Sequence, residues 1–247
     1  MKAIIMAAGK GTRLAKLGDP MPKVLRKANG RPLLSYVLDV LEGIKPEDIT
    51  VVTGYMAESV EKEYADYGCS FIRQGDDAYG TGYAVMCGIK DKQFDAYDGD
   101  IIILNGDAPL TTVETVRGMK AKQSEGFDCT LLSCVTEQKL PYGRIIRSED
   151  GSITDIREEK ECSPEEKLIK ELNVGAYVFK ANALRKGLSV INNNNNAGEY
   201  YLTDVPPAIA RCGGKVNAYI TTDENELLGV NTPEDLEEVA RLLKIGR

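Results

Sequence analysis

The chain has 247 residues, of which 43% are hydrophobic and 28% charged, and this balance at this length suits one globular α/β domain. Its net charge of −7 disfavours a nucleic-acid-binding protein. The sequence contains no histidine, which excludes triads, general bases and metal sites that depend on an imidazole.

Apolar runs alternate with helical patterns from the N-terminus, which indicates βαβ units and a mainly parallel sheet. In the first helical segment Leu34, Val37, Leu38 and Leu41 form one stripe that would lie on the sheet. The pattern predicts strands at Lys2–Ala7, Ile49–Gly54, Ser70–Arg73, Asp100–Leu104 and Asp128–Val135, and helices near Leu33–Glu42, Ala57–Asp66, Gly82–Lys90 and Val113–Gln123.

The pattern changes after Pro141. Two short runs flank Asp150-Gly151, a dipeptide typical of a β-hairpin turn. We predict this hairpin at Arg144–Arg147 and Ile153–Ile156, then a strand at Glu171–Phe179, a helix to about Leu188, a polar loop at Asn192–Asn196, a helix at Tyr201–Arg211, a strand at Lys215–Tyr219, and a final helix from Thr232-Pro233 to about Lys244. The whole chain, residues 1–247, is predicted to be one domain with an antiparallel β insertion at about 136–180.

The loop after the first strand carries two glycines, Gly9 and Gly11. From Lys10 to Arg31 there are seven Lys or Arg and one acid, Asp19. A glycine-rich turn lets backbone N–H groups surround an oxyanion, and basic side chains neutralise its charge. The segment therefore predicts a polyphosphate site, with a solvated basic loop as the alternative.

Two familiar phosphate motifs do not match this turn. A Walker loop needs a glycine where the chain has Ile4, and a dinucleotide-binding fingerprint needs a third glycine where it has Leu14. An ATPase of the Walker type and a dehydrogenase are therefore not supported.

The turn instead reads Gly-x-Gly-Thr-Arg, and Pro22-Lys23 follows eight residues later. Here the chain resembles the sugar nucleotidyltransferase family, in particular the uridylyltransferase half of the bacterial N-acetylglucosamine-1-phosphate uridylyltransferases. The pieces that carry the resemblance occur in the family's order and read MAAGKGTRL from Met6, PKVL (22–25), YGTGYAV (79–85), LNGDAPL (104–110), PYGRIIR (141–147), ELNVGAYVF (171–179), GEYYLTDV (198–205) and LGVNTPEDL (228–236).

The resemblance implies the nucleotide-diphospho-sugar transferase fold, a Rossmann-like, mostly parallel mixed sheet flanked by helices, with the insertion binding the sugar. It implies a Mg²⁺-dependent enzyme that forms UDP-N-acetylglucosamine and pyrophosphate from UTP and N-acetylglucosamine-1-phosphate. The family's hexapeptide-repeat segment is not found before the last residue, Arg247, so we expect no acetyl transfer.

The residues themselves place Asp107 just after the strand Asp100–Leu104, at the edge of a parallel sheet where ligands bind. A carboxylate there suits Mg²⁺, which takes one or two protein oxygens together with phosphate oxygens. By resemblance Asn231 is the second metal ligand, and Arg13, Lys23 and Asp107 are the catalytic residues. Charge neutralisation and positioning are what nucleotidyl transfer needs, because the attacking phosphate is already an anion.

The resemblance also implies two sets of binding residues. The sugar phosphate and sugar would meet Asn105, Gly143, Glu158, Lys160, Asn173 and Asn231. The nucleotide would meet Met6, Ala7, Ala8, Gly9, Gly11, Gln74, Gly80 and Thr81.

The base-reading segment departs from the family pattern. Gln74 stands one position further from Gly-Thr-Gly than the family's glutamine, and Ala78 replaces another frequent glutamine. Tyr83 stands where the family commonly has histidine, and the loop from Arg13 to Lys23 is a few residues longer. Another nucleoside triphosphate or another sugar-1-phosphate therefore stays an alternative. So do a catalytically inactive sugar-nucleotide-binding regulatory subunit and a GTP transferase acting on a pterin cofactor.

The partners we expect are small molecules, a nucleoside triphosphate and a sugar-1-phosphate, with no nucleic acid and no membrane. The six cysteines are scattered without a Cys-x-x-Cys pair, which is typical of free thiols in a reducing compartment. With neither a signal-peptide pattern nor a long apolar run, the sequence predicts a cytoplasmic protein. It leaves the oligomeric state open.

Overall fold

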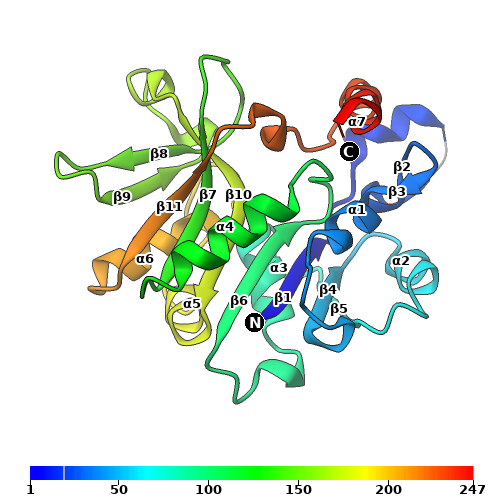
Figure 1. The fold of residues 1–247 in the computed structure, drawn as a ribbon, viewed down its shortest axis with the longest axis horizontal. Coiled ribbons are helices and arrows are strands. Elements are labelled where there is room, and N and C mark those ends of the chain that lie inside the picture. The colour runs from blue at the N-terminus through cyan, green and yellow to red at the C-terminus, as the bar shows by residue number, and fades with distance from the viewer. Residues whose placement is uncertain (19, 247) are drawn as a thin grey trace.

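The computed structural model describes residues 1–18 and 20–246, and its central feature is one nine-stranded sheet (Figure 1). The strands are β1 Lys2–Ala7, β4 Ile49–Thr53, β5 Ser70–Arg73, β6 Asp100–Asn105, β7 Cys129–Val135, β8 Arg144–Arg147, β9 Ile153–Arg157, β10 Glu171–Lys180 and β11 Val216–Thr221, with a separate pair β2 Lys27–Ala28 and β3 Arg31–Pro32. The helices are α1 Leu33–Asp39, α2 Ala57–Glu63, α3 Thr81–Gly88, α4 Val113–Gln123, α5 Ala181–Leu188, α6 Val205–Arg211 and α7 Pro233–Gly246.

The main run of the sheet has the order β11-β7-β10-β6-β1-β4-β5. Strand β1 pairs in parallel with β4 and with β6, so the carboxyl ends of these three strands meet at one edge. Strand β10 is antiparallel to both of its neighbours, β6 and β7. The predicted fold class, a mostly parallel mixed sheet between helices, is confirmed.

The residues of β1 show why helices cover both faces of the sheet. Successive side chains of a strand point to opposite faces. Ala3 and Ile5 belong to the apolar core shared with α1 and α4, whereas Ile4 belongs to the core shared with α3, α5 and α6. In Figure 1, α4 accordingly lies in front of the sheet and α3 behind it.

The antiparallel segment predicted at about 136–180 contains the β8–β9 hairpin, which joins the sheet through the pairing of β8 with β10. Strand β10, which the prediction put in the same insertion, lies inside the main sheet between β6 and β7. The hairpin therefore extends from the sheet beside the strand that carries Asn173. The boundaries of the insertion stay a prediction.

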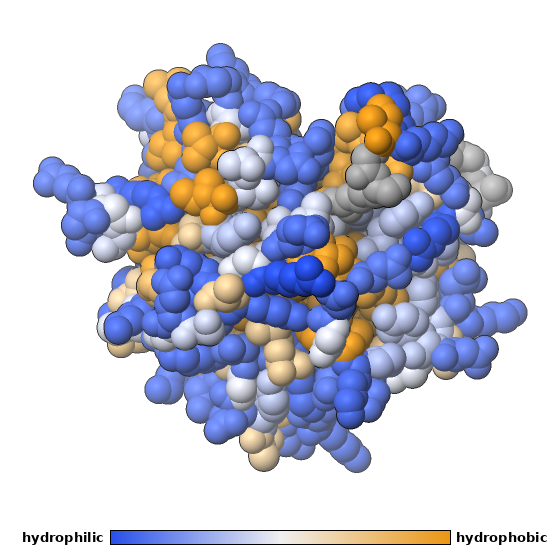
Figure 2. Space-filling view, viewed as in Figure 1, coloured by the Kyte–Doolittle hydropathy of each residue, from blue (hydrophilic) through white to orange (hydrophobic). Residues whose placement is uncertain are grey.

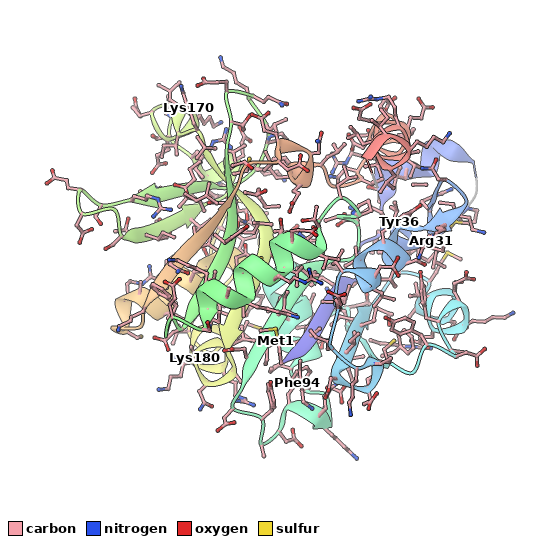
Figure 3. The ribbon with its side chains drawn as sticks, in the orientation of Figure 1. Met1, Arg31, Tyr36, Phe94, Lys170 and Lys180 are labelled. Carbon is pink, nitrogen blue, oxygen red and sulfur yellow. The ribbon has the colours of Figure 1, made fainter. Side chains whose placement is uncertain are left out.

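A third apolar core joins the two ends of the chain. Leu14, Leu33, Val239 and Leu243 are buried together, so α7 packs against the first loop and the start of α1. The β2–β3 pair is held in the same region, where the Tyr36 hydroxyl donates to the Ala28 carbonyl at 2.8 Å. Arg31 lies over the Tyr36 ring, 4.8 Å from its centroid (Figure 3).

The predicted helix at Tyr201–Arg211 is a short 3-10 turn, Leu202–Asp204, followed by α6. Pro206 and Pro207 cannot donate backbone hydrogen bonds and so mark the first turn of an α-helix. The other predicted strands and helices are confirmed, with ends that shift by a few residues. The β2–β3 pair was not predicted.

The surface is mainly hydrophilic, as Figure 2 shows for one face. Val135 and Ile220, at the ends of β7 and β11, are about half exposed, and apolar surface is visible over this part of the molecule. Across the described residues, every helix is too short or too polar to span a bilayer.

Candidate active site

A cleft of about 760 Å³ opens at the edge of the sheet where β1, β4 and β6 end. Loops that follow four different strands contribute to its walls, as expected for a ligand site in an open α/β sheet. Its lining includes Met6, Ala7, Ala8, Gly9, Lys10, Lys23, Gly54, Tyr55, Gln74, Gly75, Asp76, Tyr79, Gly80, Thr81, Asn105, Asp107 and Glu199.

The glycine turn lies directly against Lys23. Gly11 has a φ of +58°, and a Cβ atom built there would lie 3.0 Å from the Lys23 Cβ. At Gly54, a built Cβ would lie 2.8 Å from the Ala8 carbonyl oxygen, so the ends of β4 and β1 approach closely. Gly11 is favoured by its positive φ, and Gly54 by the short distance that leaves no room for a side chain.

Four predicted site residues meet at one end of the cleft. The Lys23 ammonium forms an ion pair with Asp107, and its Nζ donates to Asn231 Oδ1 at 3.0 Å. Arg13 Nη2 donates to the same oxygen at 3.2 Å. The Lys23 and Asp107 side chains are only 14% and 20% exposed, which strengthens their attraction relative to a surface pair. We call Arg13, Lys23, Asp107 and Asn231 the charged cluster.

Asn231 is brought into the cluster by backbone contacts on both of its sides. The Val230 N–H donates to the Asp107 carbonyl at 3.0 Å, which ties this segment to the loop after β6. The backbone N–H groups of Asn231 and Thr232 both donate to Asp235 Oδ2 at 2.8 Å, and the Asp235 N–H donates to Thr232 Oγ1. This reciprocal capping of α7 holds Asn231 at a helix start.

The charged cluster contains oxygen donors of the kind that Mg²⁺ binds. A carboxylate oxygen of Asp107 and the amide oxygen of Asn231 both contact one cation, the Lys23 ammonium. Hard oxygen donors within reach of one positive centre match the preference of Mg²⁺, which completes its shell with phosphate oxygens and water. The described residues contain no group of three or more Cys, Asp or Glu side chains that could hold a metal, so any Mg²⁺ site here would depend on the substrates.

Another part of the cleft lining comes from residues 74–76 and 79–81. Gln74 continues from β5, with its backbone N–H donating to the Thr53 carbonyl at 2.7 Å. Gly80 has a φ of +108°, and a Cβ built there would lie 2.2 Å from the Tyr200 carbonyl oxygen. Tyr200 also accepts from Gly82 N–H and donates its own N–H to the Tyr79 carbonyl, each at 2.8 Å. The segment is therefore fixed against residues 199–202.

Three of the predicted sugar-binding residues, Gly143, Glu158 and Asn173, lie next to the β8–β9 hairpin and outside the lining of the cleft. Asn173 is 7% exposed; its Nδ2 donates to the Tyr177 hydroxyl at 2.8 Å, and its Oδ1 has no hydrogen-bond partner among the described residues. Its backbone N–H donates to the Gly143 carbonyl at 2.8 Å. Asn105 lies nearer the charged cluster, at the cleft, and its Nδ2 donates to the Gly175 carbonyl at 3.2 Å.

Glu158, one of these three residues, accepts a hydrogen bond from Thr203 Oγ1 at 2.8 Å. Burial raises the pKa of Glu158, and the Thr203 hydrogen bond opposes that shift. Glu158 lines a neighbouring cavity of about 160 Å³ together with Asp204. Lys160 is exposed and belongs to neither cavity lining.

Sequence reasoning and the structure thus agree in part on which residues come together. Met6, Ala7, Ala8, Gly9, Lys23, Gln74, Gly80, Thr81, Asn105 and Asp107 line one cleft, and Gly11, Arg13 and Asn231 reach it through Lys23. Gly143, Glu158, Lys160 and Asn173 do not line it. Their roles stay predictions.

Several cleft residues were not singled out from the sequence, among them Tyr55, Asp76, Tyr79 and Glu199. Tyr79 and Glu199 belong to motifs that carry the resemblance, and their positions next to Gly80 and Tyr200 were the signal that could have found them. Tyr55 follows β4, so its place at the carboxyl end of a central strand was the available signal.

Comparisons with known proteins agree with this geometry. The model of the MobA-like NTP transferase domain matches residues 3–172. The bifunctional protein GlmU of Clostridium novyi is 39% identical to this chain, and the alignment covers 98% of this chain. GlmU of Corynebacterium aurimucosum is 37% identical, also over 98% of this chain. The chain spans about half the length of these relatives, 52% and 50%. The expected resemblance to the uridylyltransferase half is confirmed.

A solved structure shares the fold. It is that of a putative glucose-1-phosphate thymidylyltransferase from Bacillus anthracis in complex with sucrose. It superimposes with a TM-score of 0.75 over 100% of this chain and 96% of that one, at 19% identity.

Proposed function

The chain belongs to the MobA-like NTP transferase family, and from this we propose that it is a Mg²⁺-dependent sugar-1-phosphate nucleotidyltransferase that joins UTP and N-acetylglucosamine-1-phosphate. The observation that carries the proposal is the charged cluster beside a glycine turn. The relatives at 37–39% identity include proteins named bifunctional protein GlmU, which supports this substrate pair.

The reaction needs positioning and charge neutralisation more than acid–base catalysis. An oxygen of the sugar phosphate forms a bond to the α-phosphorus of the nucleotide, and the bond from that phosphorus to the bridging oxygen of pyrophosphate breaks. The nucleophile and the leaving group are both anions near neutral pH, so no proton has to move. A site without histidine is therefore sufficient.

The chain's own cations would provide the neutralisation. Lys23 is the more buried of the two cations of the charged cluster, and the glycine turn lies against it. Arg13 adds a second positive charge at the same place. Fixed charges and N–H donors that are already in position stabilise developing negative charge without reorganisation. When bound through Asp107 and Asn231, Mg²⁺ would supply a further Lewis acid for phosphate oxygens.

The acceptor sugar would be recognised next to the β8–β9 hairpin. The Asn173 amide oxygen is buried and unpartnered among the described residues, so it can accept a hydrogen bond from an N-acetyl N–H or a hydroxyl. The Glu158 carboxyl, which already accepts from Thr203, can also accept hydrogen bonds from sugar hydroxyls. These two groups favour an acceptor with a polar substituent over a bare phosphate.

A second nucleotide is favoured by one observation, the Asp76 carboxylate on the cleft wall near Gln74. An ionised carboxylate only accepts hydrogen bonds, and guanine presents two adjacent N–H donors, whereas uracil presents one between two acceptors. The Gln74 amide both donates and accepts, and so matches the uracil edge. GTP is therefore the second candidate.

The test is pyrophosphate release in the presence of Mg²⁺, with UTP, dTTP, CTP and GTP each paired with N-acetylglucosamine-1-phosphate and with glucose-1-phosphate. We expect the highest kcat/KM for UTP with the N-acetylated sugar. Asp107→Asn should lower kcat by about a hundredfold or more. The matched control is Asp66→Asn, which changes an exposed carboxylate after α2 and should leave kcat unchanged.

The other outcomes each have a meaning. Preference for GTP would replace UTP with the second candidate nucleotide and would assign recognition of the base to Asp76. Release with glucose-1-phosphate alone would contradict the acceptor assignment. Binding of nucleotides without any pyrophosphate release would replace the enzyme with a sugar-nucleotide-binding regulatory protein.

A further inference from the structure

One aromatic ring and one cation lie next to each other in the lining of the cleft. The Lys10 Nζ lies 5.6 Å from the centroid of the Tyr79 ring. Both residues line the cleft, and the Tyr79 side chain is 49% exposed although it is a large aromatic group. Lys10 stands between the two glycines of the turn that lies against Lys23.

The backbone that carries Tyr79 is held firmly, whereas its ring is not buried. The Tyr79 carbonyl accepts from the Tyr200 N–H, and the next residue, Gly80, touches the Tyr200 backbone so closely that no side chain fits there. A rigid backbone with an exposed ring is an arrangement that costs little entropy when a flat ligand covers the ring.

We propose that Tyr79 determines nucleotide affinity in two ways: its ring stacks on the nucleobase, and the same ring holds the Lys10 ammonium at the glycine turn for the polyphosphate. This inference rests on the proposed function and adds Tyr79, which is not among the site residues predicted from the sequence. Bases stack on aromatic rings whatever their identity, and a cation is attracted to the face of a ring.

The neighbouring residues support a base at this place. Gln74, Gly75 and Asp76 line the same cleft, and their polar groups are an amide, a glycine backbone and a carboxylate. The edge of a base could meet those polar groups while its face lies on Tyr79. Stacking would then supply affinity, and the choice between bases would be left to Gln74 and Asp76.

The first experiment uses fluorescence. The chain contains no tryptophan, so Tyr79→Trp introduces a single reporter at the proposed platform. We expect UTP to quench its emission in a saturable way, and N-acetylglucosamine-1-phosphate alone to leave it unchanged. Tyr55→Trp is the matched control, because Tyr55 is a 37% exposed tyrosine on the same cleft that has no cation over its ring among the described residues. Quenching confined to Tyr55→Trp would overturn the proposal.

The second experiment separates stacking from the positioning of Lys10. Tyr79→Leu should raise the KM for the nucleoside triphosphate about tenfold, with kcat and the KM for the sugar phosphate within twofold of the wild type. Tyr79→Phe should behave like the wild type, because stacking on the base and the contact with Lys10 need the ring and not the hydroxyl. An unchanged nucleotide KM in Tyr79→Leu, or equal losses in the Leu and Phe variants, would refute the role of the ring.

Inorganic tripolyphosphate, which has no base, probes the contact with Lys10. Its inhibition constant should rise in Lys10→Met and in Tyr79→Leu, and the double variant should be no weaker than Lys10→Met alone. Additive effects would show that Tyr79 does not position Lys10. Lys122→Met is the control, since Lys122 lies over Phe127 at a similar 5.7 Å but belongs to α4, outside the cleft. If the wild type binds UTP but releases no pyrophosphate, the proposed function fails while these binding tests still decide the role of Tyr79.

Discussion

Asp204 is a carboxyl group whose surroundings oppose its ionisation. Burial raises its pKa to about 6, and the nearby carboxylates of Asp155 on β9 and of Glu158 and Glu161 after it add to the rise. Only the Arg211 charge acts in the opposite direction among the causes identified. This acidic group adjoins the predicted sugar site, because Asp204 and Glu158 line the same small cavity.

The sign of the pH effect follows from this shift. The folded-state pKa of Asp204 lies above the ordinary value of 3.8, so the native state binds more protons than the unfolded state between about pH 4 and pH 6. The free energy of unfolding should therefore fall as pH rises through this window. We predict that Asp204→Asn raises the melting temperature at pH 7.5 by more than it does at pH 4, measured by circular dichroism.

Asp150 provides a control of opposite sign. Hydrogen bonds from Ser148 and from the Ser152 N–H lower its pKa to about 2, so its ionised form stabilises the β8–β9 turn at neutral pH. Asp150→Asn should lower the melting temperature at pH 7.5, and this loss should shrink as pH falls toward 2. Identical pH profiles for the two variants would contradict both assignments.

At the scale of elements, Gly80 joins the start of α3 to the segment around Tyr200. Its positive φ and the 2.2 Å approach of a built Cβ to the Tyr200 carbonyl oxygen both forbid a side chain. Gly126 has a similar φ of +98° but nothing within 4 Å of a built Cβ. Gly80 also has a ψ of 164°, in a region that is essentially restricted to glycine, so a side chain there combines backbone strain with steric overlap, whereas Gly126 tests a positive φ without overlap.

We predict that Gly126→Ala lowers the free energy of unfolding by about 1–2 kcal/mol, the usual cost of a left-handed backbone for alanine. Gly80→Ala should cost at least about 2 kcal/mol more, because the contact with Tyr200 must also open. Urea denaturation of both variants measures the difference. Equal losses would mean that the segment around Tyr200 moves freely away from α3.

The same elements show what could be predicted from the sequence. The strands β1, β4, β5 and β6 are short apolar runs between polar segments, and their pattern alone located them within a residue or so. The place of β10 could not be predicted, because apolar alternation does not say which neighbours a strand pairs with. The β2–β3 pair is two residues long in each strand and leaves no periodic signal.

The candidate site divides in the same way. Asp107 and the glycine turn could be predicted from their positions after β6 and β1, because parallel strands bring their carboxyl ends to one edge. The contact between Lys10 and Tyr79 could not, since it depends on how the loop before α3 folds against Tyr200. Short sequence patterns thus located Asp107 and the glycine turn, whereas only the tertiary structure revealed Tyr79 as the proposed stacking residue.

At the scale of the whole molecule, the charged cluster depends on packing between the two ends of the chain. Leu14 from the first loop and Val239 and Leu243 from α7 share one apolar core, and this core keeps Asn231 beside Arg13 and Lys23. The chain carries a net charge of −7, and its cleft combines Lys10 and Lys23 at the glycine turn with the carboxylates of Asp76, Asp107 and Glu199. Binding of anionic substrates would therefore depend on where these cations stand and not on the net charge of the lining.

The last prediction concerns metal removal from the whole protein. Asp107 and Asn231 are already partnered by Lys23 and Arg13, so the fold does not need a metal to satisfy their oxygens. We therefore predict that EDTA abolishes pyrophosphate release and that added Mg²⁺ restores it, while the melting temperature with and without EDTA agrees within about 1 °C. Turnover that persists in EDTA would mean that Lys23 and Arg13 suffice to neutralise the phosphates.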